Sequence, residues 1–234
     1  MAATETPSTS SDFLDTEYRL RDVGLFLRQA FHTFRATGAV APSGPALSNA
    51  LTRFLAERED TGTGLSILEA GAGTGPVSRA IAAQMREGDT ADLVESNAEF
   101  ADYLRDLTTT DPALSRVADQ LTVHQALVTD LGTDRRYDLI ISGLPFANFT
   151  AEEVREIFEY YFTVLRPGGR LSFFGYLYTK QVKAVVAPRD AFLQQARSSW
   201  VVEEWVNRYG IGSERVLPNI PPAWIHHLRK PIEE

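Results

Sequence analysis

Two acidic residues and three glycines form the pattern in this sequence that most clearly suggests chemistry. Glu69 precedes Gly71, Gly73 and Gly75, and Glu95 follows the last glycine by twenty positions. Glycine tolerates positive φ and lets the backbone approach a ligand closely. Where such a loop joins a strand to a helix, a nucleoside binds at the carboxyl edge of the sheet, and an acid after the next strand accepts hydrogen bonds from ribose hydroxyls. The spacing therefore predicts a nucleoside ligand whose ribose lies on Glu95.

Two details distinguish among nucleoside ligands. Pro76 occupies the last position of the G-x-G-x-x-G/A pattern and has no N–H to offer a pyrophosphate. Glu69 would repel a phosphate, but it suits a ligand that carries an ammonium and a sulfonium group. We therefore expect S-adenosylmethionine as the cofactor, in preference to NAD or FAD.

The elements that must position these residues alternate between strand and helix patterns. Short apolar runs at residues 66–70, 91–95, 121–125, 137–142 and 170–176 are separated mostly by helical stretches. This alternation predicts a parallel sheet covered by helices on both faces, which is a Rossmann-like, doubly wound α/β fold.

The end of the chain predicts a different strand arrangement. We expect residues 198–206 and 223–230 to form a final antiparallel strand pair, because the segment between them, RYGIGSERVLPNIPP, has no helical spacing.

The sequence before this core predicts a helical extension. Apolar residues at three- and four-residue spacing indicate an amphipathic helix over residues 23–34, with arginines on another stripe. A second helix is expected over residues 47–55, with Ser43 as its N-cap. The predicted division of the chain is a disordered leader at residues 1–11, the extension at 12–60 and the core at 61–234, the last two forming a single domain.

Composition excludes several classes of protein. With 234 residues, of which 44% are hydrophobic and 23% charged, the chain can bury a core, so a disordered or fibrous protein is excluded. The net charge of −8 disfavours nucleic acid as a partner. The absence of cysteine excludes disulfides and thiolate metal sites, and the four histidines lack metal-ligand spacing, so we expect no metal. With no apolar run long enough to span a bilayer, we expect a cytoplasmic protein, peripheral at most to a membrane surface.

Several of these motifs resemble those of class I S-adenosylmethionine-dependent methyltransferases. LEAGAGTG corresponds to the cofactor loop of that family, the glutamate of LVESN to its ribose-binding acid, and VLRPGGRLSFF to the turn before its fifth strand. The resemblance covers residues 66 to about 176. It implies seven strands in the order 3-2-1-4-5-7-6, and we also expect Ser96, Ser142 and Gly143 at the cofactor, with His124 flanking the adenine or simply ending a strand.

The methyl acceptor should lie where the chain leaves the fourth strand, at residues 142–149. Adenine-methylating enzymes carry Asn or Asp before the proline there, whereas this chain has Ser142-Gly-Leu-Pro-Phe146, which weighs against adenine despite similarity to ribosomal RNA adenine dimethylases. RATGAVAPSGPAL, SGLPFANF, FFGY and NIPPAWIHHLRK instead resemble segments of bacterial phospholipid N-methyltransferases. That resemblance runs from about Tyr18 to Lys230. It implies methylation of phosphatidylethanolamine or a related amino lipid, with the amino-terminal helix on the membrane.

Methyl transfer needs an amine held in line, about 3 Å from the methyl group. We expect Tyr176 and Asn148 to contact that amine. The aromatic faces of Phe146, Phe149 and Tyr178 are candidates to hold the methylated cation. Three alternatives stay open: a methyltransferase for a soluble amine metabolite, an enzyme similar to ribosomal RNA adenine dimethylases, and a non-catalytic surface or partner-binding protein.

Overall fold

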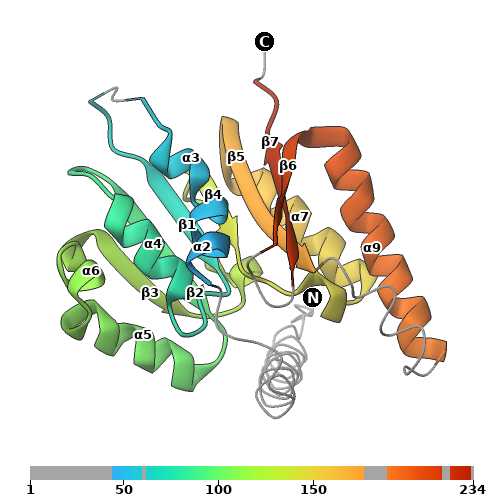
Figure 1. The fold of residues 1–234 in the computed structure, drawn as a ribbon, viewed down its shortest axis with the longest axis horizontal. Coiled ribbons are helices and arrows are strands. Elements are labelled where there is room, and N and C mark those ends of the chain that lie inside the picture. The colour runs from blue at the N-terminus through green and yellow to red at the C-terminus, as the bar shows by residue number, and fades with distance from the viewer. Residues whose placement is uncertain (1–43, 60–61, 177–188, 218–221, 233–234) are drawn as a thin grey trace, which may run out of the picture.

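A single sheet organises the part of the chain that the computed structural model describes, which is residues 44–59, 62–176, 189–217 and 222–232 (Figure 1). Its seven strands lie in the order β3-β2-β1-β4-β5-β7-β6. The strands are β1 (Ser66–Ala70), β2 (Thr90–Glu95), β3 (Leu121–Gln125), β4 (Tyr137–Ser142), β5 (Leu165–Tyr176), β6 (Gly210–Val216) and β7 (Ala223–Arg229). The first five pair in parallel, and β7 runs antiparallel to β5 and β6. The predicted doubly wound fold and the strand order that the resemblance implied are both confirmed.

The expectation that residues 198–206 form a strand is wrong, because they lie within helix α9 (Arg189–Tyr209). Val201 is buried in one core cluster, and Val202, Trp205 and Val206 pack against the same cluster. These positions recur at three- and four-residue spacing, so a helix brings them to one face, which lies against α7. Besides β5, the antiparallel partner of β7 is β6, which follows this helix.

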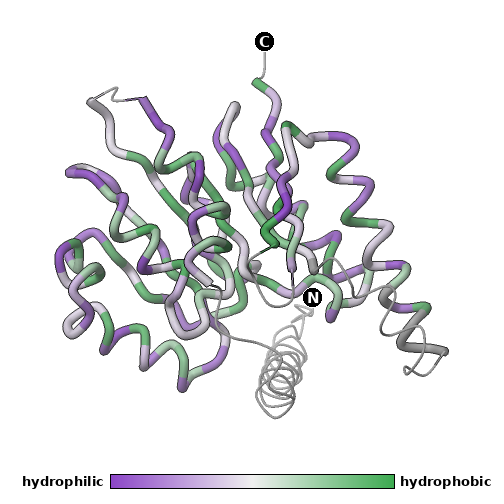
Figure 2. The backbone as a smooth tube through the Cα atoms, in the orientation of Figure 1, coloured by the Kyte–Doolittle hydropathy of each residue, from purple (hydrophilic) through white to green (hydrophobic). Residues whose placement is uncertain are grey.

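Helices cover both faces of the sheet. On one face lie α2 (Pro45–Leu51), α3 (Arg53–Ala56), α4 (Pro76–Gln84), α5 (Ala98–Thr110) and α6 (Pro112–Ser115); α7 (Ala151–Val164) and α9 lie on the other. Each face buries its own apolar cluster against the strands. Figure 2 shows hydrophobic residues along the strands and hydrophilic ones along the outer sides of the helices. The sheet is therefore buried on both sides, as parallel strands require.

The extension predicted before the core is described only from Gly44 onward. Leu47, Leu51 and Leu55 are buried as expected, but two short helices replace the single predicted one, and they meet at Thr52. Gly44 is the N-cap of α2. Ser43, the predicted cap, and the amphipathic helix predicted over residues 23–34 lie outside the described residues.

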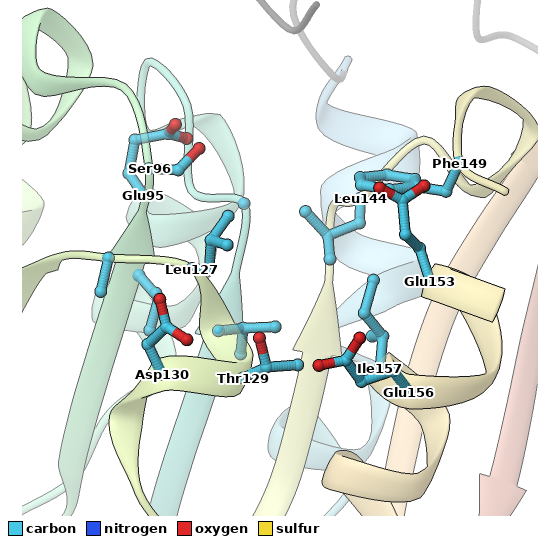
Figure 3. Close-up of a pocket in the computed structure, with 14 residues that line it drawn as sticks. Glu95, Ser96, Leu127, Thr129, Asp130, Leu144, Phe149, Glu153, Glu156 and Ile157 are labelled. Carbon is cyan, nitrogen blue, oxygen red and sulfur yellow. The ribbon is translucent and has the colours of Figure 1, made fainter. Parts of the chain in front are cut away.

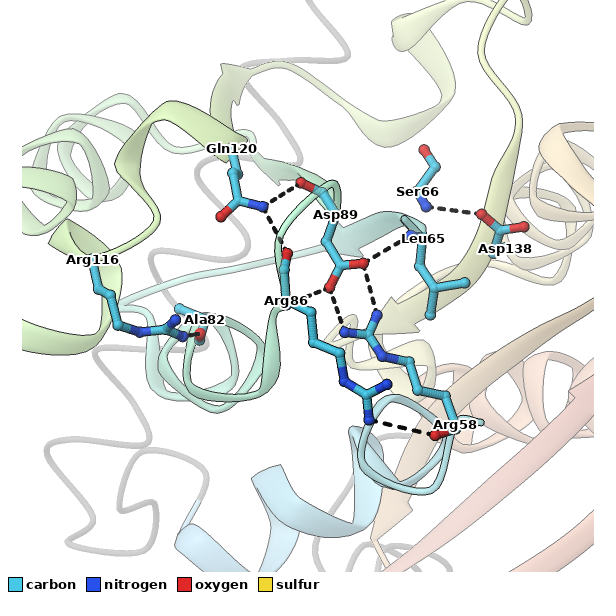
Figure 4. Close-up of polar contacts among 9 residues, drawn as sticks. All are labelled: Arg58, Leu65, Ser66, Ala82, Arg86, Asp89, Arg116, Gln120 and Asp138. Carbon is cyan, nitrogen blue, oxygen red and sulfur yellow. Dashed lines mark hydrogen bonds and ion pairs between the residues drawn. The ribbon is translucent and has the colours of Figure 1, made fainter. Parts of the chain in front are cut away.

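A buried carboxylate ties this extension to the amino edge of the sheet (Figure 4). Asp89 accepts hydrogen bonds from Arg58 Nη1 and the Leu65 N–H on Oδ1, both at 2.8 Å, and from the Arg86 N–H on Oδ2 at 2.7 Å. Burial acts to raise the pKa of Asp89, but the hydrogen bonds from Arg58 and the two backbone N–H groups outweigh it and lower the pKa. The charge of Arg58 is thus paired inside the protein.

Candidate active site

The carboxyl ends of the first four strands open onto a cleft that α7 closes from the other side (Figure 3). The cleft holds about 880 Å³ of space, part of it open to solvent. One wall comes from the ends of β1 and β2 and from the segment after β3, and the other from the exit of β4 and the first turns of α7. A cleft at this edge of a doubly wound sheet is the expected place for a nucleoside.

The glycine loop is fitted closely to the exit of β4. Gly71, Gly73 and Gly75 have φ of 74°, 56° and 82°. The Gly143 N–H donates to Ala70 O at 2.8 Å, and a Cβ on Gly143 would lie 2.7 Å from Gly71 O. A Cβ on Gly73, by contrast, would meet nothing within 4 Å. The loop is therefore packed on one side and leaves open space on the other, as a ligand-binding loop needs.

Glu95 lies at the end of β2 and lines the cleft beside Ser96. It is only 5% exposed, and its two carboxylate oxygens accept the N–H groups of Gly73 and Asn97, each at 2.8 Å. Burial raises the pKa of Glu95, and these backbone hydrogen bonds act against the rise. A carboxylate offers about four lone-pair sites, so Glu95 can hold the loop and still accept hydrogen bonds from two ribose hydroxyls.

Glu69 lies beneath the loop. It is 1% exposed, and Ser78 Oγ donates to its Oε2 at 2.6 Å. Burial raises the pKa of Glu69 to about 7, the hydrogen bond from Ser78 acts in the opposite direction, and the charge of Glu95 adds to the rise. A cation bound nearby would favour the ionised form of Glu69. Two buried carboxylates around a glycine loop suit a cationic adenosyl ligand better than a phosphate.

The structure brings together only some of the predicted site residues. Gly71, Glu95, Ser96 and Phe149 line the same cleft. Ser142 is fully buried behind it and accepts a hydrogen bond from the Tyr161 hydroxyl at 3.0 Å. The cofactor roles of all the residues predicted for them stay predictions: Glu69, Gly71, Gly73, Gly75, Glu95, Ser96, Ser142 and Gly143.

The residues predicted to contact the methyl acceptor are likewise not all found at the cleft. Phe146 packs in the core, with its ring 5.0 Å from that of Phe158 and 5.5 Å from that of Phe173. Asn148 is half-buried in the 3₁₀ turn η3 (Phe146–Asn148), directly before Phe149. Tyr176 ends β5, but its side chain, like the whole of Tyr178, lies outside the described residues. The acceptor roles of all these residues stay predictions.

Sequence reasoning missed most of the outer half of the cleft. Leu127, Thr129 and Asp130, in and before the 3₁₀ turn η2 (Val128–Leu131), face Glu156 and Ile157 of α7 across it (Figure 3). The i, i+3 and i+4 positions of Glu153, Glu156 and Ile157 on one helix were the available signal.

His124 was expected to flank the adenine or to end a strand. It lies within β3 and does not line the cleft; its Nε2 contacts Asp92 Oδ1 at 2.7 Å. Among the residues that the structure describes, no three His, Asp or Glu side chains gather as a metal site would require.

Comparisons with known proteins agree with this geometry. Residues 67–169 match a family model described as a methyltransferase domain. The chain is 26% identical over 212 residues to the ornithine lipid N-methyltransferase of Singulisphaera acidiphila, an alignment that covers 90% of this chain and 97% of that protein.

Solved structures show the same fold. The O-methyltransferase from Bacillus cereus, in complex with SAH, superposes with a TM-score of 0.60 at 15% identity, covering 88% of this chain and 90% of that one. The O-methyltransferase TomG from Streptomyces achromogenes, in complex with SAM, gives a TM-score of 0.57 at 16% identity, covering 88% and 89%. The acidic glycine loop, the cleft at the carboxyl edge and the matching domain model together identify an S-adenosylmethionine-dependent methyltransferase, which has the fold of these solved enzymes and resembles lipid N-methyltransferases.

Proposed function

We propose that this enzyme transfers a methyl group to the primary amine of an amino lipid, such as ornithine lipid or phosphatidylethanolamine. The observation that carries the proposal is the similarity to an ornithine lipid N-methyltransferase over 90% of the chain. That similarity extends well beyond residues 67–169, which the domain model matches. Segments outside the cofactor-binding part are therefore shared as well, and those segments are where acceptor specificity is expected to reside.

S-adenosylmethionine supplies an activated sulfonium leaving group when it is bound. The residues of the chain then act by orienting the two reactants. Glu95 binds the ribose, the glycine loop packs against the cofactor, and the β4 exit holds the acceptor amine in line with the methyl group. The neutral amine nitrogen would form the new N–C bond as the S–C bond breaks, with the electron pair kept by sulfur and the proton lost from nitrogen to water. Because an alkyl ammonium has a pKa of about 10, we propose that the Asn148 amide oxygen accepts a hydrogen bond from the neutral amine. Phe149 offers a face for the methylated cation.

Access to a lipid requires contact with a bilayer surface. No helix in the described part of the chain has the length and apolarity to cross a membrane. We propose that the amphipathic helix predicted over residues 23–34 makes surface contact instead.

Transfer of labelled methyl groups to vesicles tests the proposal. Vesicles of phosphatidylcholine with ornithine lipid or phosphatidylethanolamine are expected to accept label on nitrogen. Matched vesicles containing the N-acetylated lipids, or phosphatidylglycerol with its free hydroxyls, are expected to accept none. Label appearing only on soluble ethanolamine or ornithine would overturn the lipid acceptor and favour the soluble-metabolite alternative. Label on phosphatidylglycerol would overturn N-methylation.

A further inference from the structure

Two adjacent tyrosines of α7 make hydrogen bonds to two different segments, the end of η2 and the end of β4. The hydroxyl of Tyr160 donates to Gly132 O at 3.0 Å, and the hydroxyl of Tyr161 donates to Ser142 Oγ, also at 3.0 Å. Both tyrosines are buried. Burial raises the pKa of Tyr160 to about 12, and it raises that of Tyr161 as well, so both hydroxyls remain protonated donors at neutral pH.

The two acceptors lie directly behind opposite walls of the cofactor cleft. Gly132 follows η2, whose residues Thr129 and Asp130 line one wall. Ser142 ends β4 two residues before Leu144, which lines the other wall and contacts the glycine loop. In Figure 3, the residues of these two walls face each other across the cleft. A single turn of α7 is therefore bonded to both walls.

Each bond fixes a segment whose backbone needs an anchor. Gly132 has a φ of 74° and a ψ of −179°, a conformation open essentially to glycine alone, and a Cβ there would meet no atom within 4 Å. The Tyr160 hydroxyl holds the carbonyl of this turn. Ser142 is 0% exposed and its Oγ also accepts the Leu144 N–H at 3.4 Å. The Tyr161 hydroxyl therefore acts on the wall through Ser142.

Helix α7 itself contributes to the same cleft. Glu153, Ile157 and Tyr161 are spaced by four residues and lie on one stripe of the helix. The first two line the cleft, and the third lies one turn deeper at Ser142. The position of α7 therefore affects both walls together.

We propose that Tyr160 and Tyr161 are positioning residues that set the separation of the two walls, and so the affinity for the cofactor rather than the rate of the chemical step. The inference rests on the cofactor site described above and deepens it. When a wall is already ordered before binding, no free energy of binding is lost in ordering it. Loss of one such hydrogen bond is expected to weaken binding by about 3- to 10-fold.

Calorimetric titration with S-adenosylhomocysteine tests this in Tyr160→Phe, Tyr161→Phe and the double variant. Tyr137→Phe is the matched control, because its buried hydroxyl donates to Asp92 Oδ2 at 2.8 Å and neither of these two residues lines the cleft. All these variants are expected to lose thermal stability. Tyr160→Phe and Tyr161→Phe are each expected to raise Kd by about 3- to 10-fold, the double variant by at least as much, and Tyr137→Phe is expected to leave Kd unchanged. In methyl transfer they should raise KM for S-adenosylmethionine by the same factor and leave kcat within about twofold.

The energetic coupling between Tyr161 and Ser142, which accepts its hydrogen bond, gives a second measurement. In a Ser142→Ala background, Tyr161→Phe is expected to have no further effect on Kd, whereas Tyr160→Phe should keep its effect. Should Tyr161→Phe not fold, Tyr160→Phe and its control decide the question alone.

Failure of this inference can be distinguished from failure of the cofactor site. Unchanged Kd in the Tyr160 and Tyr161 variants, or a shift equal to that of Tyr137→Phe, would overturn the inference while Glu95→Ala still weakens binding. Binding that ignores Glu95→Ala as well would overturn the cofactor site itself.

Discussion

Replacement of Glu95 by alanine is expected to weaken binding of both S-adenosylmethionine and S-adenosylhomocysteine. Its carboxylate already accepts the Gly73 and Asn97 N–H groups at 2.8 Å each, which leaves about two of its four lone-pair sites for ribose hydroxyls. Hydrogen bonds to a charged group contribute about 1.5–3 kcal/mol. We therefore expect the dissociation constant to rise about 10- to 150-fold.

The same substitution should lower the free energy of unfolding, because the two backbone N–H groups lose their acceptor. We expect a loss of about 1.5–3 kcal/mol, since these groups can rehydrate once the cleft is open to water. Urea denaturation measures this loss separately from affinity. Asp102→Asn, which removes one exposed carboxylate on α5, is the control for net charge and should change neither quantity by more than about 0.5 kcal/mol.

Calorimetry with the two ligands shows whether Glu95 acts through hydrogen bonds to the ribose or through its charge. They share the ribose and differ in the charge on sulfur, so a loss through ribose hydrogen bonds must be equal for both. A loss confined to S-adenosylmethionine would mean that Glu95 acts only through its charge. An unchanged Kd for S-adenosylhomocysteine would refute the assignment of Glu95 to the ribose.

Three further changes test other parts of the structure. Because the pKa of Glu69 is raised to about 7 and a bound cation favours its ionised form, affinity for S-adenosylmethionine should fall about tenfold per unit as pH drops below 7. Glu69→Gln should remove this slope in calorimetry, and an equal slope in both proteins would contradict the reasoning. Gly143→Ala places a Cβ 2.7 Å from Gly71 O, so it should displace the cofactor loop, lower stability by about 1–3 kcal/mol and raise KM for the cofactor; wild-type KM would speak against that packing. Arg58→Ala leaves the buried carboxylate of Asp89 without its cation and should lower the free energy of unfolding by about 3–5 kcal/mol in urea, and a loss under about 1 kcal/mol would show that the pair is not buried in solution.

The central strands and the cofactor loop could be predicted because their signals are local. Each of the first four strands is a run of five or six residues bounded by polar or glycine-rich segments, and such runs alternating with helical stretches are typical of a parallel sheet. Glu95 was found by its distance along the chain from the loop, which the strand and helix lengths of one β–α–β unit determine.

Strand β6, helix α9 and the outer part of the cleft depend on tertiary packing and could not be predicted from local signals. The residues of β6 are mostly exposed, and Val216 is its one buried position, so no alternation marks this edge strand, which forms because β7 offers it backbone hydrogen bonds. Val201, Val202 and Trp205 have strand-like propensities, but α9 packs them against α7. The outer cleft combines η2 with α7, and only the folded chain brings these two segments together.

A crystal structure of the protein with S-adenosylhomocysteine would show where the ribose binds. We expect the ribose hydroxyls to lie within hydrogen-bond distance of Glu95, with the adenine between the segment at Leu127–Asp130 and the wall at Leu144 and Ile157. A ligand bound elsewhere, or one whose ribose points away from Glu95, would contradict this expectation.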